Sequence, residues 1–485
     1  MAGMADLADL ADTEPTWTLH PDRMLPADPT ERAIARRLYG HVKDLPIISP
    51  HGHVPPEWIA QDIPFHDPTS LLLSPDHYVC RLLHADGVDL ADLGMGVATS
   101  GQHLDADGAR RAWRIFCERW PLYRGTPSRY WMETELVEIF GVTQRPSAKT
   151  ADAIYDQIAA CLADPAYKPR ALMDRFDIAL IATTDDPCDD LRHHRALADE
   201  GYPRRVLPTF RPDRYLEPAR LDWPALVAAL GQAASIDTGT YAGYLAALEN
   251  RRAYFKDHGA VSTDHSHADV VTLSLSDAEA SAIYAAALAG TATDEQCTAF
   301  RRHMLVEMAR MAVEDGLVMT LHPAVARNHH TAAFERFGAD VGFDIPISVE
   351  FTRGLQPLLE CFGTAPGFHL VLFTLDETTF SREIAPLAGV YPSVYAGVPW
   401  WFIDAPEAIR RFRGAVTETA GFSRTSGFID DTRAFCSIPA RHDMSRRLDC
   451  GFLARLVAEH RLDEDEAADT AYDLVATNPR KVFKL

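Results

Sequence analysis

Lysine is scarce in this sequence, and several common catalytic motifs are missing from it. The 485 residues include six lysines, at positions 43, 149, 168, 256, 481 and 484, and none ends a short apolar run that could be a strand. A carbamylated lysine that bridges two metal ions at a strand end is therefore excluded, which favours a mononuclear centre. The sequence also has no GxxxxGK phosphate loop, no HExxH zinc motif and no GxSxG nucleophile elbow.

Positive charge is also in short supply. The 47 Lys and Arg residues face 69 Asp and Glu residues, which gives a formal net charge of −22 at pH 7. Nucleic acid and anionic membranes need a basic surface, so neither is an expected partner. No apolar run approaches the roughly 20 residues of a membrane span. An anionic ligand could therefore enter only a cleft in which arginines reverse the local charge.

The cysteines and the N-terminal segment indicate the compartment. The eight cysteines are scattered and form no CxxC pair, so we expect them to be reduced. The segment MAGMADLADLADTEPTW lacks the basic region and the apolar core of a signal peptide. We therefore predict a cytoplasmic protein in which residues 1–19 form an acidic tail.

Short apolar runs rich in Val, Ile and Leu alternate with longer amphipathic segments. The runs are continuous rather than alternating in polarity, as expected of parallel strands that are buried on both faces. Strand–helix alternation repeated eight times predicts an α/β fold, a (β/α)8 TIM barrel. The candidate strands are 45–49, 178–184, 205–210, 259–264, 317–322, 369–374, 393–399 and 426–431.

The first two candidate strands are separated by a segment that is too long for a loop. Residues 54–177, approximately, contain helical stripes such as Trp113, Phe116 and Trp120 at i, i+3 and i+7. We predict that this segment is a helical insertion over the mouth of the barrel. Because no Ser/Gly linker marks a second domain, residues 20–485 are predicted to form one barrel domain.

A His-x-His motif follows the first candidate strand. Side chains two positions apart on an extended chain point the same way, so His51 and His53 can both face the barrel lumen. Chemistry in such barrels gathers at the carboxyl ends of the strands. Two imidazoles there could bind one divalent ion, and Asp431, which ends the last candidate strand, would complete an open site. Zinc is the expected metal, with manganese, cobalt and nickel as alternatives.

A second His-x-His motif leaves an alternative open. His265 and His267 follow the fourth candidate strand with the same spacing and could bind the metal instead. Asp264 and His265 could equally form hydrogen bonds with substrate hydroxyl groups. The adjacent pairs His193–His194 and His329–His330 would diverge on a strand, so we expect them to lie exposed on helices or loops.

The ordered set of strand-end motifs resembles the uronate isomerases (glucuronate isomerases), a branch of the amidohydrolase superfamily. The resemblance extends from about residue 20 to the C-terminus. It implies a (β/α)8 barrel of the metal-dependent hydrolase type with a helical insertion after the first strand. The matching segments are KDLPIISPHGH at 43–53, DHYVCRLLHADGV at 76–88, TTDDP at 183–187, VLPTFRPD at 206–213, TDH at 263–265, LHPAVARN at 321–328, WWF at 400–402 and DDTRAF at 430–435.

The resemblance also implies roles for individual residues. His51, His53 and Asp431 correspond to the metal ligands. The residues that the resemblance places around the substrate are His77, Tyr78, Arg211 and Arg433. Asp264, Trp400 and Trp401 stand at the ends of other candidate strands, and we expect them to contact the substrate as well. A divalent metal ion and a small hexuronate are therefore the expected partners, and assembly into a homo-oligomer is left open.

The implied reaction interconverts D-glucuronate with D-fructuronate, and D-galacturonate with D-tagaturonate. An aldose–ketose isomerisation through a cis-enediol needs a base near C1 and C2, an electrophile and a partner for the distal carboxylate. Asp431 and Tyr78 are both candidates for the proton transfer, and His322 is a third. A mononuclear metal-dependent hydrolase and a non-catalytic sugar-acid-binding barrel remain alternative functions.

Overall fold

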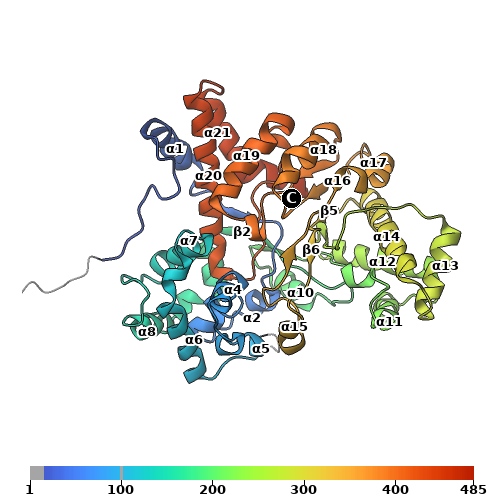
Figure 1. The fold of residues 1–485 in the computed structure, drawn as a ribbon, viewed down its shortest axis with the longest axis horizontal. Helices are drawn as coiled ribbons and strands as arrows, with labels where there is room; N and C mark the ends of the chain where they lie inside the picture. The colour runs from blue at the N-terminus through green and yellow to red at the C-terminus, as the bar shows by residue number, and fades with distance from the viewer. Residues whose placement is uncertain (1–15, 99–101) are drawn as a thin grey trace, which may run out of the picture.

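The computed structural model describes residues 16–98 and 102–485. Short parallel strands lie near its centre (Figure 1). The strands pair in the orders β1-β2-β3 and β4-β5-β8-β9. Most of their side chains are buried, as their continuous apolar sequences require. Seven of the eight segments that were predicted as strands contain an observed strand: β1 (Ile47–Ser49), β2 (Ile178–Ala182), β3 (Arg205–Leu207), β4 (Ser262–His265), β5 (Val318–Leu321), β8 (Leu370–Leu372) and β9 (Val394–Ala396).

Single bridges join the two sheets into one barrel wall. Phe210 forms parallel bridges with Asp185 and Thr263, so it connects the end of β3 to β4. On the other side, the His53 N–H donates to the Thr432 carbonyl at 3.0 Å and joins the first and last strand positions. The predicted (β/α)8 barrel is therefore confirmed.

The eighth candidate strand is the exception, and the prediction of a strand at 426–431 was wrong. This segment starts beside β9, where the Ser426 N–H donates to the Ala396 carbonyl at 3.0 Å. It then leaves the sheet because Gly427 and Asp431 have φ angles of 77° and 42°, which lie outside the extended region. The segment still occupies the eighth place in the ring, but its backbone turns as it reaches Asp431.

The segment between β1 and β2 is helical and has its own apolar core. Trp113, Phe116, Ile154 and Ile158 are all buried in that core, which continues onto β1 and β2. Trp17 is also buried there, whereas residues 1–15 of the predicted acidic tail lie outside the described residues. The helices are α2 (Pro56–Gln61), α3 (Pro68–Leu72), α4 (His77–Ala85), α5 (Met95–Ala98), α6 (Ala106–Glu118), α7 (Pro127–Thr134), α8 (Ala151–Leu162) and α9 (Pro169–Arg175).

Further helices connect the barrel strands along the outside of the ring. The longest of them presents Phe300, Met304, Met308 and Met311 to the core as one apolar stripe. The connecting helices are α10 (Arg192–Glu200), α11 (Trp223–Ala234), α12 (Tyr241–Asp257), α13 (Asp277–Leu288), α14 (Asp294–Asp315), α16 (Phe351–Gly354), α17 (Gln356–Phe362), α18 (Ala385–Val390) and α19 (Pro406–Ala420).

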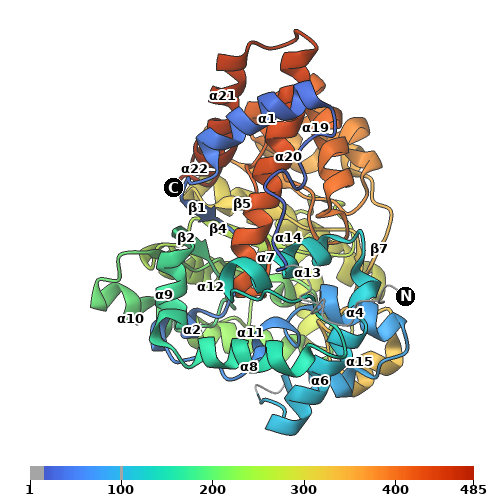
Figure 2. The same ribbon diagram turned by 90° about the vertical axis from the view of Figure 1, so that its left-hand side faces the viewer.

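The two ends of the described chain pack together. Figure 2 shows α1 (Pro29–Val42) across α20 (Ile438–Ala458) and α21 (Glu464–Tyr472), and the chain ends after α22 (Asn478–Phe483). Within residues 16–98 and 102–485, no helix is long and apolar enough to cross a membrane.

A short arm after β5 was not predicted. Its two strands, β6 (Val325–Ala326) and β7 (Ile345–Pro346), pair antiparallel on either side of α15 (Thr331–Phe337). Two-residue strands leave too short a periodic pattern to detect in a sequence. The arm contributes to the wall of the cavity described next.

Candidate active site

The carboxyl ends of the barrel strands surround a cavity of about 520 Å³. Each residue predicted for the site lines it, although these residues come from widely separated parts of the sequence. The predicted residues that meet in the cavity wall are His51, His53, His77, Tyr78, Arg211, Asp264, His322, Trp400, Trp401, Asp431 and Arg433.

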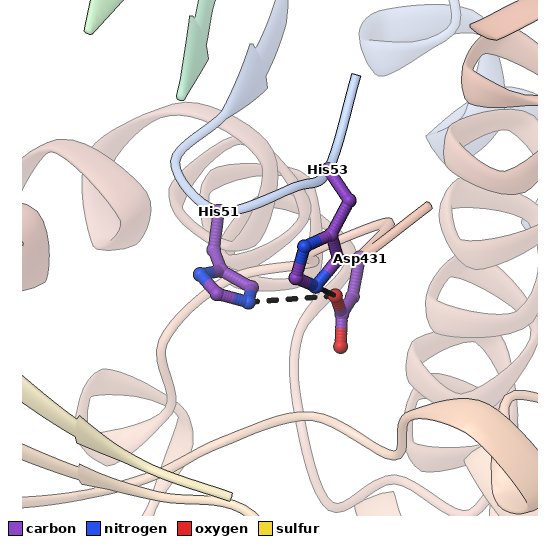
Figure 3. Close-up of side chains that lie close together, drawn as sticks. All are labelled: His51, His53 and Asp431. Atoms are coloured by element: carbon purple, nitrogen blue, oxygen red, sulfur yellow. Dashed lines mark ion pairs between the residues drawn. The ribbon is translucent and has the colours of Figure 1, made fainter. Parts of the chain in front are cut away.

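His51, His53 and Asp431 form a compact group, here called the His–Asp triad (Figure 3). The Oδ1 atom of Asp431 lies 3.0 Å from Nε2 of His53 and 3.4 Å from Nε2 of His51. Burial alone would raise the pKa of Asp431, but the two neighbouring imidazoles hold it well below its ordinary value. The triad therefore contains an ionised carboxylate.

The triad fits a divalent cation. Among the described residues, Asp431 Oδ1 is buried without a hydrogen-bond partner, although two imidazole nitrogens lie close to it. Two imidazoles and one carboxylate are the donor set of an open catalytic zinc site, in which three protein ligands leave a position for a small molecule. The adjoining cavity provides space for that molecule.

His322 is oriented by Asp264. Its Nδ1 atom lies 2.7 Å from Asp264 Oδ1, and its ring stacks on Phe373 at a centroid distance of 4.1 Å. The ring also stacks on His51 at 4.8 Å. Because the carboxylate accepts a hydrogen bond from Nδ1–H, this tautomer leaves the Nε2 lone pair available at the cavity wall. His51, Asp264 and His322 lie close enough to form an alternative ligand set that shares His51 with the triad.

Five arginines line the same cavity, and each is paired with a carboxylate of the protein. We call Arg211, Arg327 and Arg433 the arginine group. Nε of Arg211 lies 3.0 Å from Asp213 Oδ2 and 3.4 Å from Asp264 Oδ2. Nη2 of Arg433 donates to Asp340 Oδ2 at 3.1 Å, and Nη1 of Arg327 donates to Asp344 Oδ2 at 2.6 Å.

The unpredicted arm supplies part of the arginine group and its partners. Arg327, Asp340 and Asp344 all lie between the start of β6 and the start of β7. Burial alone would raise the pKa of Asp340, yet Arg433 and Arg327 lower it to about 2. Arg327 belongs to the LHPAVARN segment, so the sequence contained a signal for it, whereas Asp340 had none.

The start of α4 places His77 and Tyr78 in the cavity wall. Asp76 caps the helix by accepting the Tyr78 N–H at 2.8 Å. Burial, followed by the charge of Arg433, lowers the pKa of His77 to about 3, so its imidazole is neutral. Burial raises the pKa of Tyr78 above its ordinary value, so the phenol keeps its proton at neutral pH. The Tyr78 ring also lies beside the guanidinium of Arg441, at 4.8 Å.

The remaining histidine pairs lie elsewhere. His265 and His267 are buried but are not part of the cavity wall, and they form a separate group with Asp213. His329 and His330 are exposed, as expected. The expectation for His194 was wrong, because this residue is buried and its Nε2 lies 2.9 Å from the Thr183 hydroxyl oxygen.

Comparisons with known proteins agree with this geometry. A family model described as glucuronate isomerase matches residues 29–483. A uronate isomerase of Cutibacterium acnes is 59% identical over 97% of this chain and 99% of its own length. The crystal structure of glucuronate isomerase from Caulobacter crescentus has a TM-score of 0.93 at 47% identity, covering 96% of this chain and 97% of that one. A uronate isomerase structure from Thermotoga maritima has a TM-score of 0.89 at 27% identity, covering 96% and 100%. The chain therefore belongs to the glucuronate isomerase family.

Proposed function

We propose that this protein is an aldose–ketose isomerase that interconverts D-glucuronate with D-fructuronate, and D-galacturonate with D-tagaturonate. The observation that carries the proposal is one cavity that contains both the His–Asp triad and the arginine group. A hexuronate has a carbonyl end that needs an electrophile and a carboxylate end that needs a cationic partner. The family membership of the chain supports the same reaction.

The His–Asp triad is proposed to hold one divalent ion, with zinc as the first choice and manganese, cobalt and nickel as alternatives. When bound, such an ion polarises the carbonyl and hydroxyl oxygens at C1 and C2 of the sugar acid. The protein itself must then orient the sugar and move one proton between adjacent carbons.

Arg211 and Arg433 are proposed to bind the uronate carboxylate. A guanidinium keeps its charge and offers two parallel N–H donors to a carboxylate, which a single ammonium cannot do. Trp400, Trp401 and His77 line the same cavity and restrict the orientations of the sugar ring. These guanidiniums supply the cationic donors that a uronate needs in a chain with a net charge of −22, but the uronate must share them with the carboxylates already paired to them.

Asp431 is proposed to carry the proton from C2 to C1 of a cis-enediol. Its carboxylate is ionised because its pKa lies well below the ordinary value, so it can accept the proton. Tyr78 retains its proton at neutral pH and is suited to donate a hydrogen bond to a substrate oxygen. His322, fixed by Asp264, is a third group that could exchange a proton through Nε2.

A direct assay tests the proposal. The protein is stripped with a chelator, reloaded with one metal at a time, and supplied with D-glucuronate or D-galacturonate. We expect the ketose product only from the reloaded protein. Hydrolysis of an amide or ester panel without isomerisation would instead favour a metal-dependent hydrolase. Uronate binding without turnover would favour a non-catalytic sugar-acid-binding barrel.

A further inference from the structure

A second cluster of metal-ligand residue types lies behind the arginine group. His265 ends β4, His267 follows two residues later, and Asp213 follows β3. One side-chain donor atom from each residue lies within 4.8 Å of the other two. Both histidines are almost completely buried, with 1% and 5% of their surfaces exposed. The cluster touches the cavity only through Asp213.

The hydrogen bonds of the two histidines occupy the outer nitrogen of each ring. Nδ1 of His267 lies 2.8 Å from Glu217 Oε1, so Nδ1–H donates a hydrogen bond to that carboxylate. Nε2 of His265 lies 3.0 Å from the hydroxyl oxygen of Thr263. Metal-bound histidines typically donate their outer N–H to such an acceptor, which fixes the tautomer.

The inner nitrogens of the cluster lack hydrogen-bond partners. Within the described part of the chain, this holds for Nδ1 of His265 and Nε2 of His267, both of which are buried. Nε2 of His267 lies 3.6 Å from Asp213 Oδ1. This separation is longer than a normal hydrogen bond, and it leaves room for one cation to bind both atoms.

The spacing suits such a cation. Two ligands bound to a tetrahedral ion at about 2.1 Å are separated by about 3.4 Å, close to the observed 3.6 Å between His267 and Asp213. The nearby Arg211 does not leave an excess of positive charge, because it contacts Asp264 as well as Asp213. Glu217 adds a further carboxylate next to His267.

We propose that His265 Nδ1, His267 Nε2 and Asp213 Oδ1 form a second divalent-cation site, distinct from the His–Asp triad. Two imidazoles and a carboxylate make zinc the fitting ion. The site is buried behind the cavity wall, so its ion would hold Asp213 in place and thereby orient the Arg211 guanidinium. The proposal concerns metal content and does not depend on the isomerase function.

Metal stoichiometry tests the second site. The chain is loaded with zinc, freed of excess ion by gel filtration and analysed by elemental mass spectrometry. We expect two ions per chain in the wild type, one in the double variant His51→Ala/His53→Ala, one in His267→Gln, and none in the triple variant. His303→Gln is the matched control, because His303 is a buried histidine hydrogen-bonded to Tyr241 and outside the cluster. This variant should keep two ions.

Cobalt provides a second measurement. The double variant loaded with Co2+ should show the visible absorption bands of a low-coordinate cobalt site, and His267→Gln should remove them. One zinc per wild-type chain overturns the proposal whether or not any variant folds. That result would mean that the cluster is a hydrogen-bond network around Arg211 and binds no ion. Isomerase activity in that one-ion protein would uphold the proposed function while rejecting the second site.

Discussion

The His–Asp triad and the arginine group share one cavity but differ in how their charges are balanced. In the triad, one carboxylate oxygen faces two imidazole nitrogens and has no hydrogen-bond partner within the described residues, so the group is arranged to receive a cation. In the arginine group, each guanidinium already contacts a carboxylate of the protein. The cavity is therefore arranged to receive a metal ion, whereas a uronate must share its arginines with internal carboxylates.

Removal of the triad should have the largest effect. We expect His53→Ala to lose the ion of this site and to lower kcat/KM by about 10³-fold or more, because the electrophile for the carbonyl is lost. The fold should persist, since the triad is added to the ends of packed strands. Elemental analysis, circular dichroism and the uronate assay measure these effects. Full turnover after chelation would contradict the metal assignment.

Asp431→Asn separates proton transfer from metal binding. The amide keeps the shape and some ligand capacity but cannot accept a proton, so isomerisation should fall by about 10²–10⁴-fold even where metal is retained. Tyr78→Phe should reduce the rate less. In the wild type, C2-deuterated glucuronate should yield some product with deuterium at C1, detected by NMR. Substantial activity of metal-loaded Asp431→Asn would move the base to Tyr78 or His322.

The arginine group should discriminate between charged and neutral sugars. Arg433→Met or Arg211→Met should weaken uronate use by about 10²-fold, because a buried carboxylate would lose a charge-assisted partner. Neutral parent hexoses should be affected far less. Lysine at either position should restore only part of the loss, since it cannot reproduce the bidentate geometry. Equal losses for acidic and neutral sugars would indicate a structural role.

Asp340→Asn tests whether an internal carboxylate competes with the substrate. Asp340 accepts from Arg433 at 3.1 Å, and its pKa of about 2 keeps it ionised throughout the neutral range. With the charge removed, Arg433 should bind the uronate more strongly, so KM should fall several-fold with little change for neutral sugars. Asp344→Asn, next to Arg327, is the matched comparison on the same arm. A higher KM for Asp340→Asn would show that Asp340 positions Arg433 instead.

The smallest expected effect concerns Asp185, a carboxylate of the cavity wall that is not paired with an arginine among the described residues. It accepts hydrogen bonds from the Thr183 hydroxyl and the Thr209 N–H. Burial raises its pKa to about 7. The folded state therefore holds this proton more tightly than the unfolded state, and the associated stability is lost as pH rises from about 4 to 7. Relative to Asp185→Asn, the wild type should lose about 2–3 kcal/mol of unfolding free energy between pH 5 and pH 8. The unfolding free energy is measured by denaturant titration at each pH. An equal change with pH in the two proteins would contradict the raised pKa.

Much of the site was predictable because its signals are local. The His51–Gly52–His53 spacing follows a buried strand, and polar residues such as Arg211 and His322 stand at other strand ends. Once eight parallel strand positions close into a ring, their carboxyl ends meet at one rim, so these side chains converge whatever their separation in the sequence. The stripes of Trp113 and Phe116 likewise indicated the helices of the insertion, because a period of 3.6 residues can be detected within one segment.

The amino-acid pattern was therefore enough to predict the barrel, seven of its eight strand positions and eleven residues of the cavity wall. The pairing of the charges, in contrast, depends on packing between distant segments. Asp340 is nearly a hundred residues from its partner Arg433, and no periodic pattern marks the short arm that brings them together. The turn that orients Asp431 depends on φ angles that a run of apolar residues does not reveal. The separation of His267 from the cavity likewise arises from packing, because identical His-x-His spacings at two strand ends carry no information about which one faces the substrate.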